Sequence, residues 1–354
     1  MTVIAPGSTI GILGGGQLGR MLSMAAASLG YRTHIYAPEA SGPAADVSAR
    51  WIQGGYDDAE ALAAFAREVD VVTYEFENVP VGAIEAIGAI MPVRPGARSL
   101  KIAQDRLAEK NFVAGLGGRP APFAAVPDRA ALDTALAQIG APAVLKTVRM
   151  GYDGKGQWRI MDPADAAGLD LPAVPLIYEG FVRFAGEFSV ILVRDAAGDV
   201  RFWDSAQNEH DSGILARSTV PAPTFITAQV DAARALAAKV ADALDYVGVL
   251  TLEFFATADG PVFNEMAPRV HNSGHWTIEG ALVSQFENHI RAICALPLGS
   301  TALAARGAVM DNLIGDAARD WAQILSDPAN HLHLYGKAAV RPGRKMGHVT
   351  RLIL

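Results

Sequence analysis

Short apolar runs alternate with amphipathic stretches near the start of the chain. The runs at 9–13, 32–37 and 70–76 predict β-strands, because each is short and rich in β-branched or aromatic residues. The stretches at 17–29 and 57–69 predict helices, because their apolar residues recur at helical spacing. Strands that alternate with helices in this way form a parallel sheet, so we predict a β-α-β-α-β unit.

The pattern changes near Ser99. This serine is a suitable N-cap for a helix predicted over 100–116, and the Gly-Gly-Arg-Pro stretch at 117–120 ends that helix. Between 124 and 194, short strands surround a helix predicted over 128–139. This segment therefore reads as a small α+β unit.

The remaining pattern predicts a mixed part of helices and strands. A long helix at 227–244 is followed by a hairpin around Asp259 and Gly260, a helix near 278–296 and a β-rich tail. We therefore predict an α/β chain with three parts, 1–105, 106–190 and 191–354.

Composition narrows the classes of function. The 354 residues are 51% hydrophobic and carry a formal net charge of -7, which argues against nucleic acid as a partner because such surfaces need clustered Lys and Arg. Cys294 is the single cysteine and lies in an apolar helical stretch, so we expect a buried, inert thiol. Neither a signal peptide nor an apolar run of about 18 residues is evident, so we expect a cytoplasmic protein without a membrane partner.

A glycine turn follows the first predicted strand. Gly14, Gly16 and Gly19 have the spacing of a dinucleotide-binding fingerprint, and Glu39 lies twenty residues further on. This motif by itself allows an NAD(P)-dependent oxidoreductase. Its backbone amides at a helix N-terminus also suit other anions.

Two glutamates lie on the two strands of the hairpin near 259. A two-residue loop of Asp259 and Gly260 would put Glu253 and Glu265 on opposite faces, whereas a three-residue loop at 258–260 would place them directly opposite each other. We predict the second register. Two carboxylates so close repel each other, and Mg²⁺ with phosphate co-ligands would relieve this. The alternatives are that one glutamate faces solvent or that Arg269 neutralises the pair.

A glycine-rich loop suggests where those phosphates bind. Lys146 interrupts an apolar strand, and the loop GYDGKGQ at 151–157 follows. Such a loop can lay backbone amides against phosphate oxygens, with Lys146 reaching the α and β phosphates. A flexible hairpin beside a lysine that reaches solvent is the alternative.

Taken in order along the chain, these features resemble the ATP-grasp enzymes, and among them the 5-(carboxyamino)imidazole ribonucleotide synthetase family. The resemblance extends over essentially the whole chain. It rests on GGGQLGRM at 14–21, YEFEN at 74–78, the loop at 151–158, His210 with 213–215, NEMAPRVHNSGHW at 264–276, Lys337 and RPGRKMGH at 341–348. The segments at 264–276 and 341–348 are highly specific, whereas the first is weak alone.

The resemblance implies a fold and a set of site residues. The fold is ATP-grasp, with an N-terminal Rossmann-like parallel-sheet domain, a small α+β lid and a C-terminal mixed sheet domain. The implied ATP-binding residues are Arg106, Lys146, Gly151, Tyr152, Asp153, Gly154, Lys155, Gly156, Gln157, Glu179, Gly180, Phe181, Val182, Glu187, His210, Asn264 and Glu265. Mg²⁺ would bind Glu253 and Glu265. The implied substrate-binding residues are Gln17, Leu18, Glu75, Tyr152, Asp153, Lys155, Lys337 and Arg344, and the implied catalytic residues are Arg269, His271 and Asn272.

The resemblance also implies a reaction in purine biosynthesis. Bicarbonate would attack the γ-phosphate of ATP to give carboxyphosphate, and the exocyclic amine of 5-aminoimidazole ribonucleotide would capture the carboxyl carbon or released CO₂. Arg269 would hold bicarbonate or carboxyphosphate, and His271 and Asn272 would orient it or exchange a proton. Position 155 is commonly arginine in the family, and lysine keeps the charge but loses the bidentate fork. The family implies a homodimer.

Three alternatives remain open at this stage. A formate-dependent glycinamide ribonucleotide transformylase would share the nucleotide features but not the 269–276 and 341–348 segments. An NAD(P)-dependent oxidoreductase would leave both hairpin glutamates and the glycine loop without a role. A non-catalytic nucleotide sensor would not need all the metal and phosphate candidates.

Overall fold

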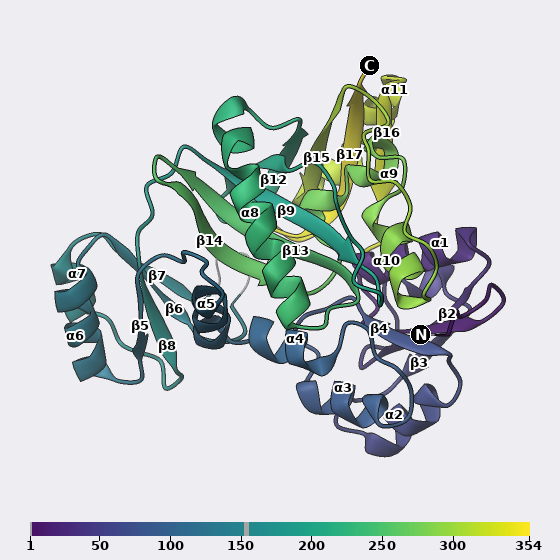
Figure 1. The fold of residues 1–354 in the computed structure, drawn as a ribbon, viewed down its shortest axis with the longest axis horizontal. Coiled ribbons are helices and arrows are strands. Elements are labelled where there is room, and N and C mark those ends of the chain that lie inside the picture. Colours follow the sequence, from purple (N-terminus) through teal and green to yellow (C-terminus); the bar gives the residue numbers. More distant parts are fainter. Residues whose placement is uncertain (1, 152–155) are drawn as a thin grey trace.

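The computed structural model describes residues 2–151 and 156–354. The N-terminal part forms the predicted parallel sheet, with strand order β3-β2-β1-β4 (Figure 1). Its elements are β1 (Thr9–Leu13), α1 (Gln17–Ser28), β2 (Arg32–Ala37), β3 (Arg50–Gln53), α2 (Ala59–Ala66), β4 (Val71–Tyr74) and α3 (Val81–Gly88). The prediction missed β3, because this short strand begins and ends with exposed polar residues and has no apolar run.

The helix predicted over 100–116 is two helices, α4 (Ala97–Ala103) and α5 (Arg106–Gly115). Between them Asp105 is extended, and its carboxylate accepts a hydrogen bond of 3.0 Å from the amide of Ala108. The prediction of one continuous helix was wrong because Asp105 is an N-cap that starts a new helix. The break places α5 beside the large sheet, where it contacts β14.

The second part is a four-stranded antiparallel sheet with the order β5-β8-β6-β7. Its elements are β5 (Phe123–Val126), α6 (Arg129–Ile139), β6 (Ala143–Thr147), β7 (Gln157–Ile160), α7 (Pro163–Ala167) and β8 (Leu176–Gly180). It has a separate core that includes Leu132, Leu145 and Tyr178. Figure 1 shows this unit projecting to the left of the rest of the molecule.

The third part is built on a sheet of nine strands among the described residues. The main order is β14-β13-β9-β11-β12-β15-β17-β16, and β10 pairs with β9. The strands are β9 (Gly186–Arg194), β10 (Val200–Phe202), β11 (Ala206–Asp211), β12 (Ile214–Val220), β13 (Gly248–Thr257), β14 (Gly260–Ala267), β15 (Gly307–Ile314), β16 (Asn330–Leu334) and β17 (Lys345–Ile353). The expected boundary between 190 and 191 falls inside β9, which pairs along its whole length with β13.

Helices cover this sheet and join it to the N-terminal part. The helices are α8 (Thr224–Ala243), α9 (Thr277–Gly280), α10 (Gln285–Ile293) and α11 (Trp321–Ser326), so the helix predicted near 278–296 is in fact two. One hydrophobic cluster contains Leu22 of α1, Ile290 of α10 and Trp203. The first and third parts therefore share a core. Cys294 is buried in the same cluster, as predicted.

The hairpin of β13 and β14 contains a β-bulge. Thr257 pairs with Gly260, so the turn has two residues and the predicted three-residue loop at 258–260 was wrong. The pairing then shifts by one residue, because Asn264 has no register partner on β13. Beyond this bulge Glu253 lies opposite Glu265, so the predicted relationship of the two acids is confirmed although the predicted turn is not.

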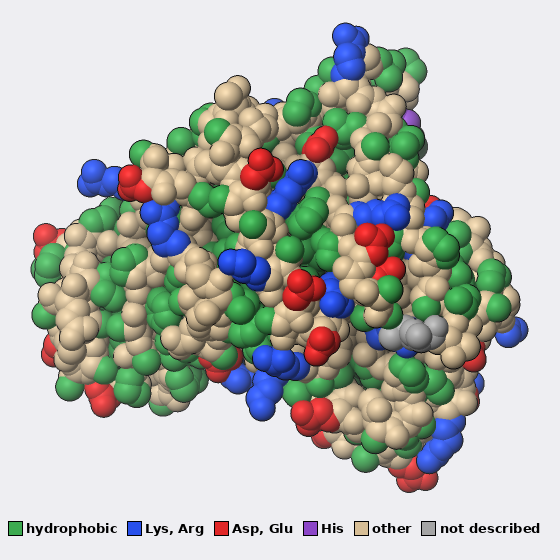
Figure 2. All heavy atoms as spheres, in the orientation of Figure 1, with side chains coloured by type: hydrophobic (Ala, Val, Ile, Leu, Met, Phe, Trp, Pro, Cys, Tyr) green, Lys and Arg blue, Asp and Glu red, His purple; other side chains and the backbone are tan. Residues whose placement is uncertain are grey.

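The surface shows mixed charge. On the face drawn in Figure 2, Lys and Arg side chains lie singly or in small groups among acidic and hydrophobic ones. This distribution agrees with the net charge of -7. Among the helices of the described chain, none is both long and apolar enough to cross a membrane.

Candidate active site

A cavity of about 750 Å³ is lined by residues from all three parts of the chain. Most predicted site residues line it: Gln17, Leu18, Glu75, Arg106, Lys146, Gly151, Gln157, Glu179, Gly180, Phe181, Val182, Glu187, His210, Glu253, Asn264, Glu265, Arg269, His271 and Asn272. Gly156, Lys337 and Arg344 are not in its lining. Tyr152, Asp153, Gly154 and Lys155 lie outside the described residues.

The two hairpin glutamates form the acidic centre of the cavity. Glu253 is 8% exposed, and Glu265 is exposed to the cavity. Burial raises the pKa of Glu253, and the charge of Glu265 raises this pKa further. A bound cation would remove both penalties, since it stabilises the ionised carboxylates.

The donor set fits Mg²⁺ together with a nucleotide. Among the residues that the structure describes, no group of three or more His, Cys, Asp or Glu side chains is arranged to hold a metal alone. Mg²⁺ commonly binds one or two protein carboxylates and completes its octahedron with phosphate oxygens and water. Glu253 and Glu265 supply that number of carboxylates.

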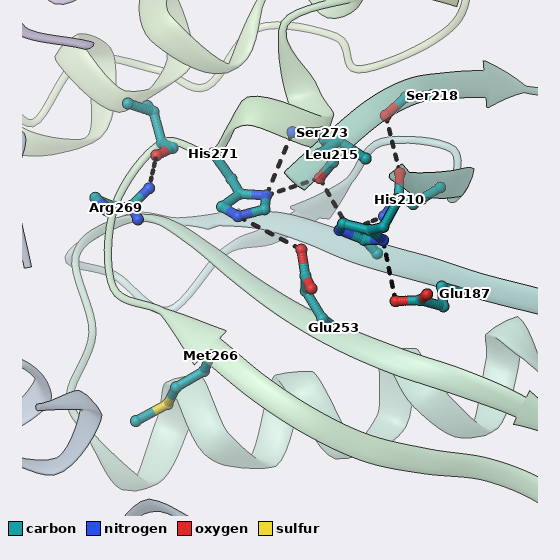
Figure 3. Close-up of polar contacts among 12 residues, drawn as sticks. Glu187, His210, Leu215, Ser218, Glu253, Met266, Arg269, His271 and Ser273 are labelled. Carbon is teal, nitrogen blue, oxygen red and sulfur yellow. Dashed lines mark hydrogen bonds and ion pairs between the residues drawn. The ribbon is translucent and has the colours of Figure 1, made fainter. Parts of the chain in front are cut away.

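A third carboxylate beside the glutamate pair, that of Glu187, forms an ion pair with a histidine. His210 of β11 lies 3.1 Å from Glu187 of β9 (Figure 3). Burial lowers the pKa of His210, but the contact with the Glu187 carboxylate and the charges of Glu253 and Glu187 outweigh this, so its pKa is raised. The surrounding acids therefore favour the protonated form of His210 beside the acidic centre.

His271 lies between Glu253 and Ser273 (Figure 3). Its Nδ1 accepts a hydrogen bond of 3.3 Å from the Ser273 amide, so we assign the proton to Nε2, which lies 3.5 Å from Glu253 Oε1. Burial and then the charge of Arg269 lower the pKa of His271 well below its ordinary value. The imidazole is thus neutral and presents an N–H toward the acidic centre.

Arg269 and Asn272 flank this histidine on the loop after β14. Arg269 donates to Glu77 Oε2 at 2.6 Å and to the Val270 carbonyl at 3.0 Å, which fixes the direction of its guanidinium. The side-chain oxygen and nitrogen of Asn272 are both buried, and neither has a hydrogen-bond partner among the residues that the structure describes. Buried polar atoms normally have a partner, so this amide is available for a ligand.

Two lysines share one buried carboxylate at the junction of the lid and the large sheet. Lys146 Nζ lies 2.9 Å from Glu179 Oε2, and Lys110 Nζ lies 3.3 Å from the same oxygen. Burial raises the pKa of Glu179, but the two lysines outweigh this effect and lower it. Lys110 would still pair with Glu179 if Lys146 alone turned away.

Arg106 contacts the glycine loop rather than open space. Its guanidinium donates to the carbonyls of Thr147 at 3.2 Å and Gly151 at 2.9 Å. Arg106 thus connects α5 with the end of β6 and the start of the predicted phosphate loop.

The N-terminal glycine turn is occupied by a side chain of the protein itself. The amides of Gly16 and Gly19 donate to the two oxygens of Glu75, at 2.8 and 3.2 Å. The sequence suggested that these amides suit a bound anion. They instead hold the Glu75 carboxylate at the cavity wall, next to Gln17 and Leu18.

The basic tail, which consists of Lys337 and the segment at 341–345, lies beside the cavity. Lys337 Nζ donates to the Lys345 carbonyl at 2.6 Å and lies 5.5 Å from the centre of the Tyr335 ring. Arg344 donates to the Ala339 carbonyl at 2.8 Å. Lys345, to which the sequence analysis assigned no role, is the tail residue that lines the cavity.

Sequence reasoning also missed Glu77, Glu109 and Lys110, which line the cavity. Glu77 belongs to the YEFEN motif, but nothing in the sequence links it to Arg269. Glu109 and Lys110 are adjacent charges on a predicted helix, a pattern that usually indicates a solvated face.

Three family models match consecutive stretches of the chain. A ribonucleotide synthetase preATP-grasp domain matches residues 7–104, an ATP-grasp domain matches 111–286, and a phosphoribosylaminoimidazole carboxylase C-terminal domain matches 308–353. The first match agrees with the separate N-terminal sheet. The ATP-grasp match covers the four-stranded sheet and part of the nine-stranded sheet, whose last three strands belong to the C-terminal match.

Individual relatives extend over nearly the full length. The chain is 51% identical to N5-carboxyaminoimidazole ribonucleotide synthase of Brucella melitensis, over 99% of this chain and 98% of that protein. A crystal structure of an N5-carboxyaminoimidazole ribonucleotide synthetase with ADP has a TM-score of 0.93 at 40% identity, covering 100% of this chain and 94% of that one.

A third relative has both ligands in its structure. N5-carboxyaminoimidazole synthase of Aspergillus clavatus, in complex with ADP and 5-aminoimidazole ribonucleotide, has a TM-score of 0.91 at 32% identity, with 98% of this chain and 94% of that chain covered. Identity and coverage at these levels establish the relationship. The chain belongs to the N5-carboxyaminoimidazole ribonucleotide synthase family of ATP-grasp proteins.

Proposed function

We propose that this chain converts 5-aminoimidazole ribonucleotide, ATP and bicarbonate into N5-carboxyaminoimidazole ribonucleotide, ADP and phosphate, a step of purine biosynthesis. The observation that carries the proposal is one cavity that joins the Glu253 and Glu265 pair to Arg269 and to Lys146. The two carboxylates suit a metal-bound triphosphate. The side chains of Arg269 and Lys146 suit the anionic groups that form and break down during the reaction.

The nucleotide would lie between the lid and the large sheet. Lys146 would leave Glu179 to bind phosphate oxygens, and the loop at 151–157 would cover them. The segment 179–182 would contact adenine through its backbone, and Glu187 would accept hydrogen bonds from the ribose hydroxyls. Glu253 and Glu265 would hold Mg²⁺, which when bound supplies charge neutralisation at the transferring phosphate.

The proposed reaction has two chemical steps. An oxygen of bicarbonate attacks the γ-phosphorus, the bond from that phosphorus to the bridging oxygen of ADP breaks, and carboxyphosphate forms. The exocyclic amine then attacks the carboxyl carbon, or CO₂ released from it, so that phosphate leaves and the nitrogen loses a proton. Anionic charge develops in both steps, so fixed cations are the expected catalysts.

Arg269, Asn272 and His271 are placed to serve the carboxyl group. Arg269 is aimed by Glu77 and would bind the bicarbonate or carboxyphosphate oxygens. The unpartnered amide of Asn272 would donate to and accept from the same group. Neutral His271 would hold its proton at Nε2 and orient the reacting anion.

The ribonucleotide would bind on the N-terminal side of the cavity. Gln17, Leu18 and Glu75 line this wall. Its phosphate would be held by Lys337 and Arg344, together with Tyr152 and Lys155, and Asp153 would contact another part of the ribonucleotide. Lys345 joins this set because it lines the cavity.

An assay of ADP release with single omissions tests the function. ATP, Mg²⁺, bicarbonate and 5-aminoimidazole ribonucleotide together should give ADP and carboxylated product in equal amounts. ADP release that ignores bicarbonate or the ribonucleotide would refute the proposal, as would activity with formate and glycinamide ribonucleotide in their place.

We also propose a cytoplasmic homodimer, on the basis of the family resemblance. Light scattering of the purified chain checks the assembly, for which we expect twice the monomer mass of 37.2 kDa. A monomer mass at micromolar concentration would contradict it.

A further inference from the structure

At Phe263 the outer edge of β14 pairs with the backbone of residues 119–120, and beyond that point side chains bind it instead of a neighbouring strand. β14 is the terminal strand of the large sheet, with β13 on its inner side. On the outer side, Lys110 Nζ donates to the Asn264 carbonyl at 3.1 Å, and Glu109 Oε1 accepts from the Met266 amide at 2.6 Å. These two backbone groups flank Glu265.

Both side chains are committed to this contact. Glu109 and Lys110 are each 2% exposed, which is costly for charged groups unless they are paired. Lys110 also lies 3.3 Å from Glu179. A donor and an acceptor on adjacent residues of α5 thus satisfy a carbonyl and an amide two residues apart, as the next strand of a sheet would do.

The acid pair explains why the edge needs such support. Glu253 and Glu265 are register partners, so their Cβ atoms lie about 5 Å apart and like charges at this distance repel each other. β13 is fixed between β9 and β14, whereas β14 beyond Phe263 has a backbone neighbour on one side only. The repulsion therefore acts to displace β14 outward, and at the Asn264 bulge the ladder with β13 is interrupted.

We propose that Glu109 and Lys110 are positioning residues that hold β14 from outside and thereby keep Glu265 at metal-binding distance from Glu253. The inference rests on the proposed role of Glu253 and Glu265 as Mg²⁺ ligands. What the site requires at these positions is a hydrogen-bond acceptor at 109 and a donor at 110. The charge of Glu109 is not itself required.

Direct metal binding tests the inference without catalysis. Mn²⁺ is titrated into the protein with saturating ADP, and free Mn²⁺ is measured by electron paramagnetic resonance. Glu109→Leu and Lys110→Met should weaken Mn²⁺ binding by about 10- to 100-fold, as is usual when the groups that orient metal ligands are lost. Lys101→Met on the exposed face of α4 is the matched control and should bind Mn²⁺ as the unaltered protein does.

Glu109→Gln keeps an acceptor and Lys110→Arg keeps a donor, so both variants should bind Mn²⁺ within about threefold of the unaltered protein. This comparison remains informative if the Leu and Met variants do not fold. A tenfold loss of Mn²⁺ affinity in Glu109→Gln would overturn the inference, as would unchanged Mn²⁺ binding in folded Glu109→Leu.

The inference and the proposed function can fail independently of each other. An unaltered protein that binds Mn²⁺ and ADP but does not carboxylate the ribonucleotide refutes the function, while weaker Mn²⁺ binding by Glu109→Leu would still support the inference.

Discussion

Glu253 faces Glu265 across the hairpin because one extra residue, Asn264, interrupts the ladder between them. Without this bulge the two-residue turn would continue its register and place Asn264 opposite Glu253. The side chain of Glu265 would then point to the other face of the sheet, because successive residues of a strand alternate. The metal-binding pair thus depends on a local irregularity.

Insertion of one glycine between Asn264 and Glu265 tests this dependence. It should lower kcat/KM for ATP by about 100-fold or more, similar to Glu265→Gln, because the inserted residue takes the place opposite Glu253 and Glu265 moves to the other face of the sheet. Asn264→Ala keeps the number of residues and is the control, with a loss of about tenfold or less expected. Steady-state kinetics checks both variants, and an insertion variant with near-normal kinetics would disprove the role of the register.

Glu77→Gln tests the support of Arg269. The substitution removes the carboxylate that accepts from the guanidinium at 2.6 Å, so Arg269 becomes less well oriented. We expect the KM for bicarbonate to rise about tenfold while the KM for ATP stays within about twofold, and the free energy of unfolding to fall by about 1 kcal/mol. Kinetics with varied bicarbonate and urea unfolding measure these values. An unchanged bicarbonate KM argues against the assignment.

His289 provides a pH-dependent stability prediction. Burial lowers its pKa to about 3; the Val249 amide donates to Nδ1 at 3.1 Å, and Nε2 lies 2.9 Å from Thr73 Oγ1. Between the unfolded pKa of about 6.5 and this value the unfolded chain binds more protons, so the free energy of unfolding decreases as pH falls. This histidine should contribute a loss of about 2 kcal/mol between pH 7 and pH 5.

Urea unfolding at pH 7, 6 and 5 checks this prediction. His289→Gln should be less stable at pH 7 but should lose about 2 kcal/mol less than the unaltered chain on going to pH 5. The exposed His331→Gln is the control and should keep the original pH dependence. Parallel pH profiles for His289→Gln and the unaltered chain would show that His289 is not the group responsible.

Lys337→Ala tests the basic tail. Lys337 lies outside the cavity lining and bonds to the backbone of Lys345, which is in the lining. We expect the KM for 5-aminoimidazole ribonucleotide to rise about tenfold, with kcat within about twofold, because substrate binding is weakened and the reacting groups are untouched. Initial rates at varied ribonucleotide provide the measurement. A loss confined to kcat would contradict a binding role.

Much of the fold was predictable from periodicity. β1 and β2 have the predicted bounds, because glycine and polar segments on either side leave little choice of where these short runs begin and end. The break at Asp105 and the bulge at Asn264 were not predictable. Both depend on a single backbone conformation, which leaves no trace in the spacing of apolar residues.

The site was predictable mainly where residue type and motif coincide. Glu253, Glu265 and Arg269 are polar residues in apolar or motif sequence, and all three line the cavity. Glu109 and Lys110 could not be found this way, since only the tertiary contact of α5 with β14 buries them. Glu75 was found through its motif, but its hydrogen bonds to the glycine turn across 59 and 56 positions of sequence were not.

The central claim is that this acidic site directs the γ-phosphate of ATP to bicarbonate. Turnover with ¹⁸O-labelled bicarbonate measures this most directly, because the attacking oxygen stays on phosphorus when the carboxyl group is transferred. Mass spectrometry should find one ¹⁸O atom in each phosphate released. Phosphate that carries oxygen from solvent water only, while carboxylated product still forms, would contradict the account.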